Sequence, residues 1–128
     1  QRPYMPSISD VSKEDDVNYG IIEFPLSIYR FLGFNLPIAG GFWLRFLNVK
    51  VIKKGIQKMN EKNLPAVLYV HSWELDPCTP RLRLNPYKSF VTYHNIEKTR
   101  KLLECLLREF HFTSFADYIK TSGNCPDL

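Results

Sequence analysis

Cysteine is scarce in this sequence, which has only Cys78, Cys105 and Cys125 among its 128 residues. The number is odd, and no two of the three stand at the short spacing of a paired-cysteine metal motif. The cysteines therefore predict neither a disulfide framework nor a cysteine-bound metal. Such usage favours free thiols or a reducing compartment.

The chain also lacks an apolar run near the length of a membrane span, and its first twenty residues lack the charged-then-apolar pattern of a secretory signal. Because it begins at Gln1 rather than at Met, we expect a processed product or a piece of a longer protein. No glycine loop ends in the Lys-Ser/Thr pair that cradles nucleotide phosphates. Basic residues are not interleaved with exposed aromatic residues, so the sequence predicts no nucleic-acid partner and no transmembrane segment.

What the chain does contain is enough apolar material for one domain, since 45% of its residues are hydrophobic and 14% aromatic. Its net charge of +4 favours an anionic polymer as partner without identifying one. We expect an extended or linker segment over residues 1–19, an α/β domain over 20–121 and a frayed tail over 122–128.

Helices are predicted where apolar residues recur at intervals of three and four, over residues 42–62 and 96–109. A short last helix over 115–120 follows a capping box formed by Ser114 and Asp117. The first helix carries a row of lysines at intervals of four, for which a solvated face is one interpretation and contact with an acidic polymer or anionic lipid the other. This row consists of Lys50, Lys54, Lys58 and Lys62.

Short strands are predicted over residues 20–24, 66–70 and 110–113. A strand-turn-strand unit within 27–39 should turn at Gly33-Phe34-Asn35. The strands thus alternate with two main helices and a short C-terminal helix, which places the chain in the α/β class.

Two segments connect these predicted elements. Gly40-Gly41 predicts a turn or a ligand-facing loop before the first helix, because adjacent glycines permit close backbone approach. Residues 78–93 have little periodicity and predict a long loop, whose end at 89–93 fits a short strand equally well. The Arg, Lys and Tyr side chains of this loop, Arg81 among them, suit hydroxyl-rich or anionic sugars.

Polar side chains of several kinds directly follow the predicted strand at 66–70: His71, Trp73, Glu74 and Asp76. The carboxyl end of a buried strand is where α/β proteins present functional groups. The alternative is an ordinary polar loop. Elsewhere, Glu23 is a solvated carboxylate or a pocket wall, and we expect His94 and His111 to be structural or solvated.

The segment His71-Ser72-Trp73-Glu74-Leu75-Asp76-Pro77, followed by Pro80-Arg81, resembles a motif of NodB-homology polysaccharide deacetylases, in particular the subfamily associated with exosortase and exopolysaccharide loci. Three more pieces agree in order and extend the resemblance over roughly residues 20 to 120. They are Glu23–Ser27, Leu36–Gly41 with Arg45, and Phe112–Tyr118.

The resemblance implies that the chain is the C-terminal portion of a distorted β/α barrel that removes N-acetyl groups from a polysaccharide with a divalent metal, commonly zinc. His71 then corresponds to the late histidine that acts as general acid. The substrate-binding residues would be Trp73, Glu74, Asp76 and Arg81. Trp73 would stack on the sugar or form a wall of its site, and Glu74 and Asp76 would orient His71 or the loop by hydrogen bonds. The early metal-binding motifs are missing from this sequence, so the metal would be held by an upstream catalytic portion of the polypeptide and not by this segment.

Two functions remain open at this stage. In the first, the chain is the C-terminal portion of a metal-dependent polysaccharide deacetylase and is inactive alone, since a general acid without metal and base gives no useful rate. In the second, it is a non-catalytic carbohydrate-binding or interaction domain. The partners are a polysaccharide and, in the first case, the upstream portion; strand edges left open in the isolated segment favour self-association.

Overall fold

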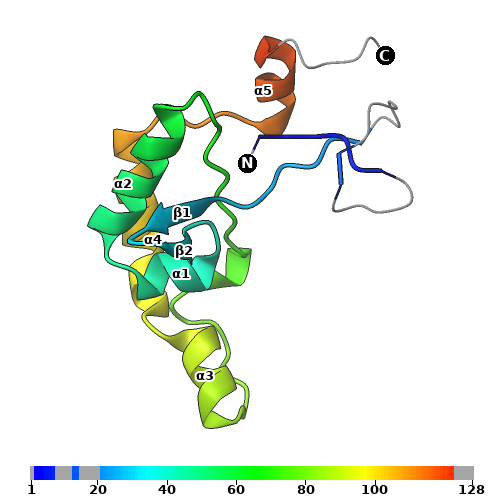
Figure 1. Cartoon of the computed structure of the whole chain (residues 1–128). Coiled ribbons are helices and arrows are strands. Elements are labelled where there is room, and N and C mark those ends of the chain that lie inside the picture. Colours follow the sequence, from blue (N-terminus) through cyan, green and yellow to red (C-terminus); the bar gives the residue numbers. More distant parts are fainter. Residues whose placement is uncertain (1, 8–12, 15–20, 123–128) are drawn as a thin grey trace.

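The computed structural model describes residues 2–7, 13–14 and 21–122, and it has a mixed α/β fold (Figure 1). The predicted α/β class is confirmed at this level. The expected tail at 123–128 and most of the expected linker, residues 8–12 and 15–20, lie outside the described residues. The elements in chain order are β1 (Ile28–Phe31), β2 (Phe34–Pro37), α1 (Gly41–Phe46), α2 (Val49–Asn60), the 3₁₀ helix η1 (Ser72–Leu75), α3 (Pro86–Tyr93), α4 (Ile96–Glu109) and α5 (Phe115–Ser122).

The strands β1 and β2 form an antiparallel hairpin, with Ile28 opposite Pro37. Its turn is Leu32-Gly33, and both residues have positive φ, 49° and 83°. A two-residue turn with positive φ at both positions matches the twist of the flanking strands. The predicted strand-turn-strand unit is therefore confirmed, but the turn comes earlier than Gly33-Phe34-Asn35 because Phe34 already belongs to β2.

The prediction of a single helix over 42–62 is wrong in one respect. The structure has two helices in this region, separated by Leu47 and Asn48. Asn48 caps the second helix, and its side chain accepts a hydrogen bond from the backbone N–H of Lys50 at 2.9 Å. The apolar spacing continues through the break, so periodicity alone did not reveal it. Downstream of the break the apolar stripe is buried, whereas Phe46 before it is exposed.

The core lies where α2 packs beside α4 and the end of the hairpin. Its buried members are Ile38, which directly follows β2, and five residues of α1, α2 and α4. These five are Leu44, Ile52, Ile56, Met59 and Leu106. Helix α4 has the predicted bounds, Ile96–Glu109, and α5 begins after the predicted capping box, in which Ser114 Oγ accepts from the Asp117 N–H at 3.1 Å.

Three predicted strands are corrected. Residues 66–70 are extended but make a single parallel bridge, in which the Tyr69 N–H donates to Ala39 O at 2.7 Å. The segment at 20–24, of which residue 20 is not described, has one antiparallel bridge between Glu23 and Tyr4. Residues 110–113 form no strand. An alternating pattern predicts extended backbone, but a strand also needs a neighbour to pair with.

The loop predicted over 78–93 is also corrected, since its second half is α3 and not a strand. The Asn85 side chain caps this helix by accepting from the Lys88 N–H at 2.8 Å, and Pro86 occupies the first turn. Asn followed by Pro is a helix-start signal. The helix was not predicted because α3 is too short to show a clear apolar stripe. Among the residues described here, none of the helices is both long and apolar enough to cross a membrane.

Candidate functional site

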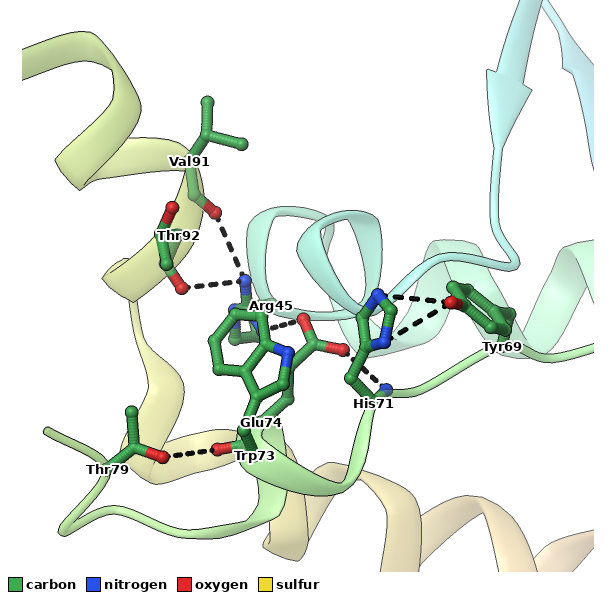
Figure 2. A network of polar contacts seen from close by, with 8 residues as sticks. All are labelled: Arg45, Tyr69, His71, Trp73, Glu74, Thr79, Val91 and Thr92. Atoms are coloured by element: carbon green, nitrogen blue, oxygen red, sulfur yellow. Dashed lines mark hydrogen bonds and ion pairs between the residues drawn. The ribbon is translucent and has the colours of Figure 1, made fainter. Parts of the chain in front are cut away.

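A buried ion pair between Arg45 of α1 and Glu74 of η1 organises the region around the predicted site (Figure 2). The two side chains are only 1% and 4% exposed. Arg45 also donates hydrogen bonds to the carbonyl oxygens of Val91 and Thr92 at the end of α3, at 3.2 and 3.3 Å. One guanidinium therefore joins α1, η1 and α3.

Gly41 makes room for this pair. A Cβ atom built on Gly41 would overlap the carboxylate of Glu74, whereas one on Gly40 would meet only Trp43 Cδ1 at 3.6 Å. Gly41 is buried and is the first residue of α1, so it does not face a ligand. The interpretation of the glycine pair as a ligand-facing loop is thus wrong for Gly41, which is required for close packing against Glu74.

The second carboxylate oxygen of Glu74 holds the backbone of His71. Glu74 Oε2 accepts from the His71 N–H at 2.8 Å, and the Glu74 N–H donates to His71 O at 3.1 Å. These two bonds form the start of η1. The backbone of His71 is therefore fixed to a buried charge pair, while its side chain is exposed.

Two aromatic side chains flank the imidazole of His71. The Tyr69 hydroxyl lies 3.2 Å from both ring nitrogens, and the Trp73 ring stacks on the imidazole with centroids 5.8 Å apart. Tyr69 and His71 share a face because side chains two residues apart point the same way along extended backbone. We call Tyr69, His71 and Trp73 the His71 cluster; Figure 2 shows these three side chains side by side.

Trp73 makes two further contacts, one through its ring and one through its backbone. The guanidinium of Arg45 lies 5.9 Å from its ring centroid, and its carbonyl oxygen accepts from Thr79 Oγ1 at 3.1 Å. A half-buried ring held by a cation and by its own backbone keeps one orientation. Its position therefore depends on the same ion pair as that of His71.

The side chains of the two remaining predicted site residues contact other partners. Asp76 Oδ1 accepts from the Cys78 N–H at 2.9 Å and so stabilises the turn after η1. Arg81 is exposed and lies over the ring of Tyr93, 5.2 Å from its centroid. The structure thus brings His71, Trp73 and Glu74 together and gives Asp76 and Arg81 local contacts of their own.

Sequence reasoning did not predict the contacts of Tyr69 or of Arg45, although Arg45 is part of the resemblance. For Tyr69 a signal existed, since it stands two residues before His71 in an extended segment. For Arg45 none did, because only the fold brings α1 against a carboxylate 29 positions away. The burial of Glu74 was likewise hidden, since a glutamate in a polar stretch predicts exposure.

The other histidines lie elsewhere. His94 packs on Phe90 with centroids 4.6 Å apart, and its Nε2 lies 2.8 Å from the amide nitrogen of Asn95. His111 is exposed and helps to line a cavity of about 210 Å³ between Phe24, α2 and the start of α5. Glu23 is half-buried, with its backbone bridged to Tyr4.

Within the described ranges, no three His, Cys, Asp or Glu side chains gather closely enough to hold a metal ion. Cys78 and Cys105 are free thiols, and Cys125 lies outside those ranges. The described residues therefore do not supply the ligand set that the divalent metal of the resemblance would require.

The site and fold define a small mixed α/β domain that presents a histidine between aromatic rings on a buried ion pair. The chain belongs to the family described as a domain of unknown function (DUF3473), whose model matches residues 3–120. Domains of this family are often found at the C-terminus of polysaccharide deacetylases. No curated protein and no solved structure matches the chain.

Proposed function

We propose that this chain is the C-terminal portion of a metal-dependent polysaccharide deacetylase in which His71 is the general acid. The observation that carries the proposal is the geometry of His71. Its imidazole is exposed, while its backbone N–H is bound to Glu74 of the buried pair with Arg45. The association of the family with deacetylase C-termini adds support.

The chemistry requires such a group. Hydrolysis of an N-acetyl amide expels an amine, and the departing nitrogen needs a proton from an acid that titrates near neutral pH, as histidine side chains in general do. His71 combines a fixed backbone with a ring that is open to a substrate. The Tyr69 hydroxyl limits rotation of the ring, and the face of Trp73 suits the apolar face of a pyranose.

The metal, commonly zinc in the family that the sequence resembles, belongs to another portion of the polypeptide in this proposal. The described residues offer no ligand set for it. The substrate is an N-acetylated exopolysaccharide, and the residues of this chain contribute proton transfer and sugar contact.

The proposal also places the chain at the end of a distorted β/α barrel. The parallel bridge between Gly40 and Tyr69 supports this, because the connection between the two bridged segments contains α1 and α2. A parallel pair joined through helices is the repeating unit of such barrels. The extended segment 66–70 would gain its full ladder of hydrogen bonds beside strands of the upstream portion.

Acetate release tests the proposal. We expect the isolated chain with added zinc to release no acetate from an N-acetylated oligosaccharide. When the chain is joined to an upstream deacetylase portion, His71→Ala should lower kcat by about 10²- to 10⁴-fold, the usual contribution of a general acid. Ser72→Ala, which alters an exposed neighbour, is the matched control. Turnover by the isolated chain that His71→Ala abolishes would overturn this division of the active site.

The second candidate is a non-catalytic carbohydrate-binding domain. It is favoured by the anchored Trp73 ring, which needs no metal to stack on a sugar. The two functions differ in the joined polypeptide: a binding domain would lose sugar affinity on Trp73→Ala but keep its kcat on His71→Ala.

A further inference from the structure

Helix α2 carries four lysines and no acidic residue over Val49–Asn60. Lys50, Lys54 and Lys58 stand at intervals of four and are exposed. We call these three residues the α2 lysine face. Like charges at this spacing each destabilise a helix by roughly 0.2–0.5 kcal/mol, and Lys50 also faces the positive end of the helix dipole.

Helix α4 shows that this arrangement is not general in the chain. Its outer surface mixes Lys98, Arg100 and Lys101 with Glu97 and Glu104. Arg100 and Glu104 form an i,i+4 ion pair at 3.1 Å. The charges of α4 thus support the helix, whereas Lys50 and Lys54 of α2 repel each other one turn apart.

The α2 lysines are only partly neutralised by the fold. Lys58 pairs with Glu61 at 2.6 Å, and Lys53, beside the lysine face, pairs with Glu109 of α4. Within the part of the chain that the structure describes, Lys50 and Lys54 have no carboxylate within ion-pair distance. Two exposed cations one helical turn apart remain available for an external anion.

The composition and burial of the rest of α2 argue against a membrane and a nucleic acid as the partner. Ile52, Ile56 and Met59 are buried in the core, so the helix has no apolar face to insert into a membrane. It also has no aromatic residue on which nucleic-acid bases would stack. A flexible chain with a carboxylate on successive units complements such a row of cations.

We propose that the α2 lysine face binds an acidic polysaccharide through its carboxylates, with Lys50 and Lys54 as the main contacts. The preference for a polysaccharide over other polyanions rests on the proposed function. The contact holds a long polymer on the domain and is separate from the His71 cluster. It is electrostatic, so it weakens as salt increases.

Polygalacturonate is the probe, with neutral dextran for comparison, and binding is measured by calorimetry at low and high salt. The double variant Lys50→Gln/Lys54→Gln should bind about fivefold to tenfold more weakly, with a smaller salt dependence, as loss of two charge contacts implies. The control Lys98→Gln/Lys101→Gln removes the same charge from exposed positions of α4. It should change affinity less than about twofold, because it leaves the α2 face intact.

Equal losses in the two double variants would overturn the proposal, as would the absence of salt-dependent binding. Tighter binding of single-stranded DNA or of anionic vesicles through the same two lysines would also overturn it. The probe carries no N-acetyl group and the variants leave His71 and Trp73 unchanged. A failure here is therefore distinguishable from a failure of the proposed deacetylase function, which acetate release reports.

Discussion

Glu74 divides its two carboxylate oxygens between structure and site. One pairs with Arg45, and the other accepts from the His71 N–H. Breaking a buried ion pair by removing one partner typically costs about 3–5 kcal/mol, because the remaining charge is left without compensation. Glu74 and Arg45 are thus positioning residues, because Glu74 binds the backbone of His71 and Arg45 contacts the ring of Trp73.

Gly41 gives the sharpest residue-scale prediction. Gly41→Ala places a Cβ atom in the volume of the Glu74 carboxylate and displaces it from Arg45. We expect the free energy of unfolding to fall by about 3 kcal/mol or more, combining overpacking with a disturbed buried pair. Urea denaturation followed by circular dichroism measures this loss.

Gly40→Ala is the matched control, because its Cβ would make an ordinary contact with Trp43. It should cost about 1 kcal/mol or less, as expected for alanine in place of glycine before a helix. Equal destabilisation by the two substitutions would show that Gly41 is not required for the Glu74 contact.

For single residues, the sequence predicted that Glu74 would orient His71 or the loop by a hydrogen bond, but not the buried ion pair that holds Glu74 itself. His71, Trp73 and Glu74 are close in sequence, so local geometry nearly ensures their proximity. Their fixation depends on Arg45, which the fold brings from α1. The local spacing of residues in the sequence does not reveal a pair this far apart in the chain.

The helices were more predictable than the strands. The bounds of α4 follow from an apolar stripe and the start of α5 from the Ser114 capping box, and both patterns are formed by residues close together in sequence. A strand depends on a distant partner: among the described residues, the apolar run at 66–70 makes a single bridge, to Gly40, and the alternating segment at 110–113 makes none. The capped break at Asn48 was missed because the apolar stripe runs across it.

The contact between α2 and α4 includes an ion pair between Lys53 and Glu109. The hydrogen bond to Glu109 raises the pKa of Lys53 above its ordinary value of 10.5, and the neighbouring Cys105 thiol acts in the same direction. Because the pKa is higher in the folded protein than in the unfolded chain, folding binds a proton at high pH. The stabilisation is complete below pH 10.5 and is lost as pH rises through the raised pKa.

Lys53→Met should therefore lower the urea midpoint of unfolding at pH 8, and the difference from the wild-type protein should shrink as pH rises above about 10.5. Lys54→Met, which removes a neighbouring exposed lysine, is the control and should show no such narrowing. A difference that stays constant through this range would show that the pair does not link α2 to α4 by charge.

On the scale of the whole molecule, the described residues form one small hairpin and several extended segments that lack a full neighbour. Figure 1 shows the extended chain after α2 running back past β1 towards η1. Tyr69 makes the one parallel bridge of this segment, to Gly40. The open backbone groups beside it are suited to a further strand, from an upstream portion or from a second copy of the chain.

The class of the fold could be predicted from the sequence, because composition and helical periodicity are properties of the whole chain. The hairpin at 28–37 could be predicted too, because it pairs residues near one another in sequence. The isolated bridges from Tyr69 to Gly40 and from Glu23 to Tyr4 could not, because their partners are distant in sequence. The same distinction applies to function: the motif at 71–77 indicated a site, and the three-dimensional structure added Arg45, Gly41 and Tyr69.

An NMR titration with an N-acetylated oligosaccharide would show whether the His71 cluster faces a sugar. The chain has two tryptophans, which report on different places: Trp73 in the cluster and Trp43 on α1. We predict saturable shifts of the Trp73 indole N–H and the His71 ring, no shift of the Trp43 indole, and loss of the response in Trp73→Ala. An unmoved Trp73 signal, or equal shifts of both indoles, would mean that the sugar does not bind at the His71 cluster.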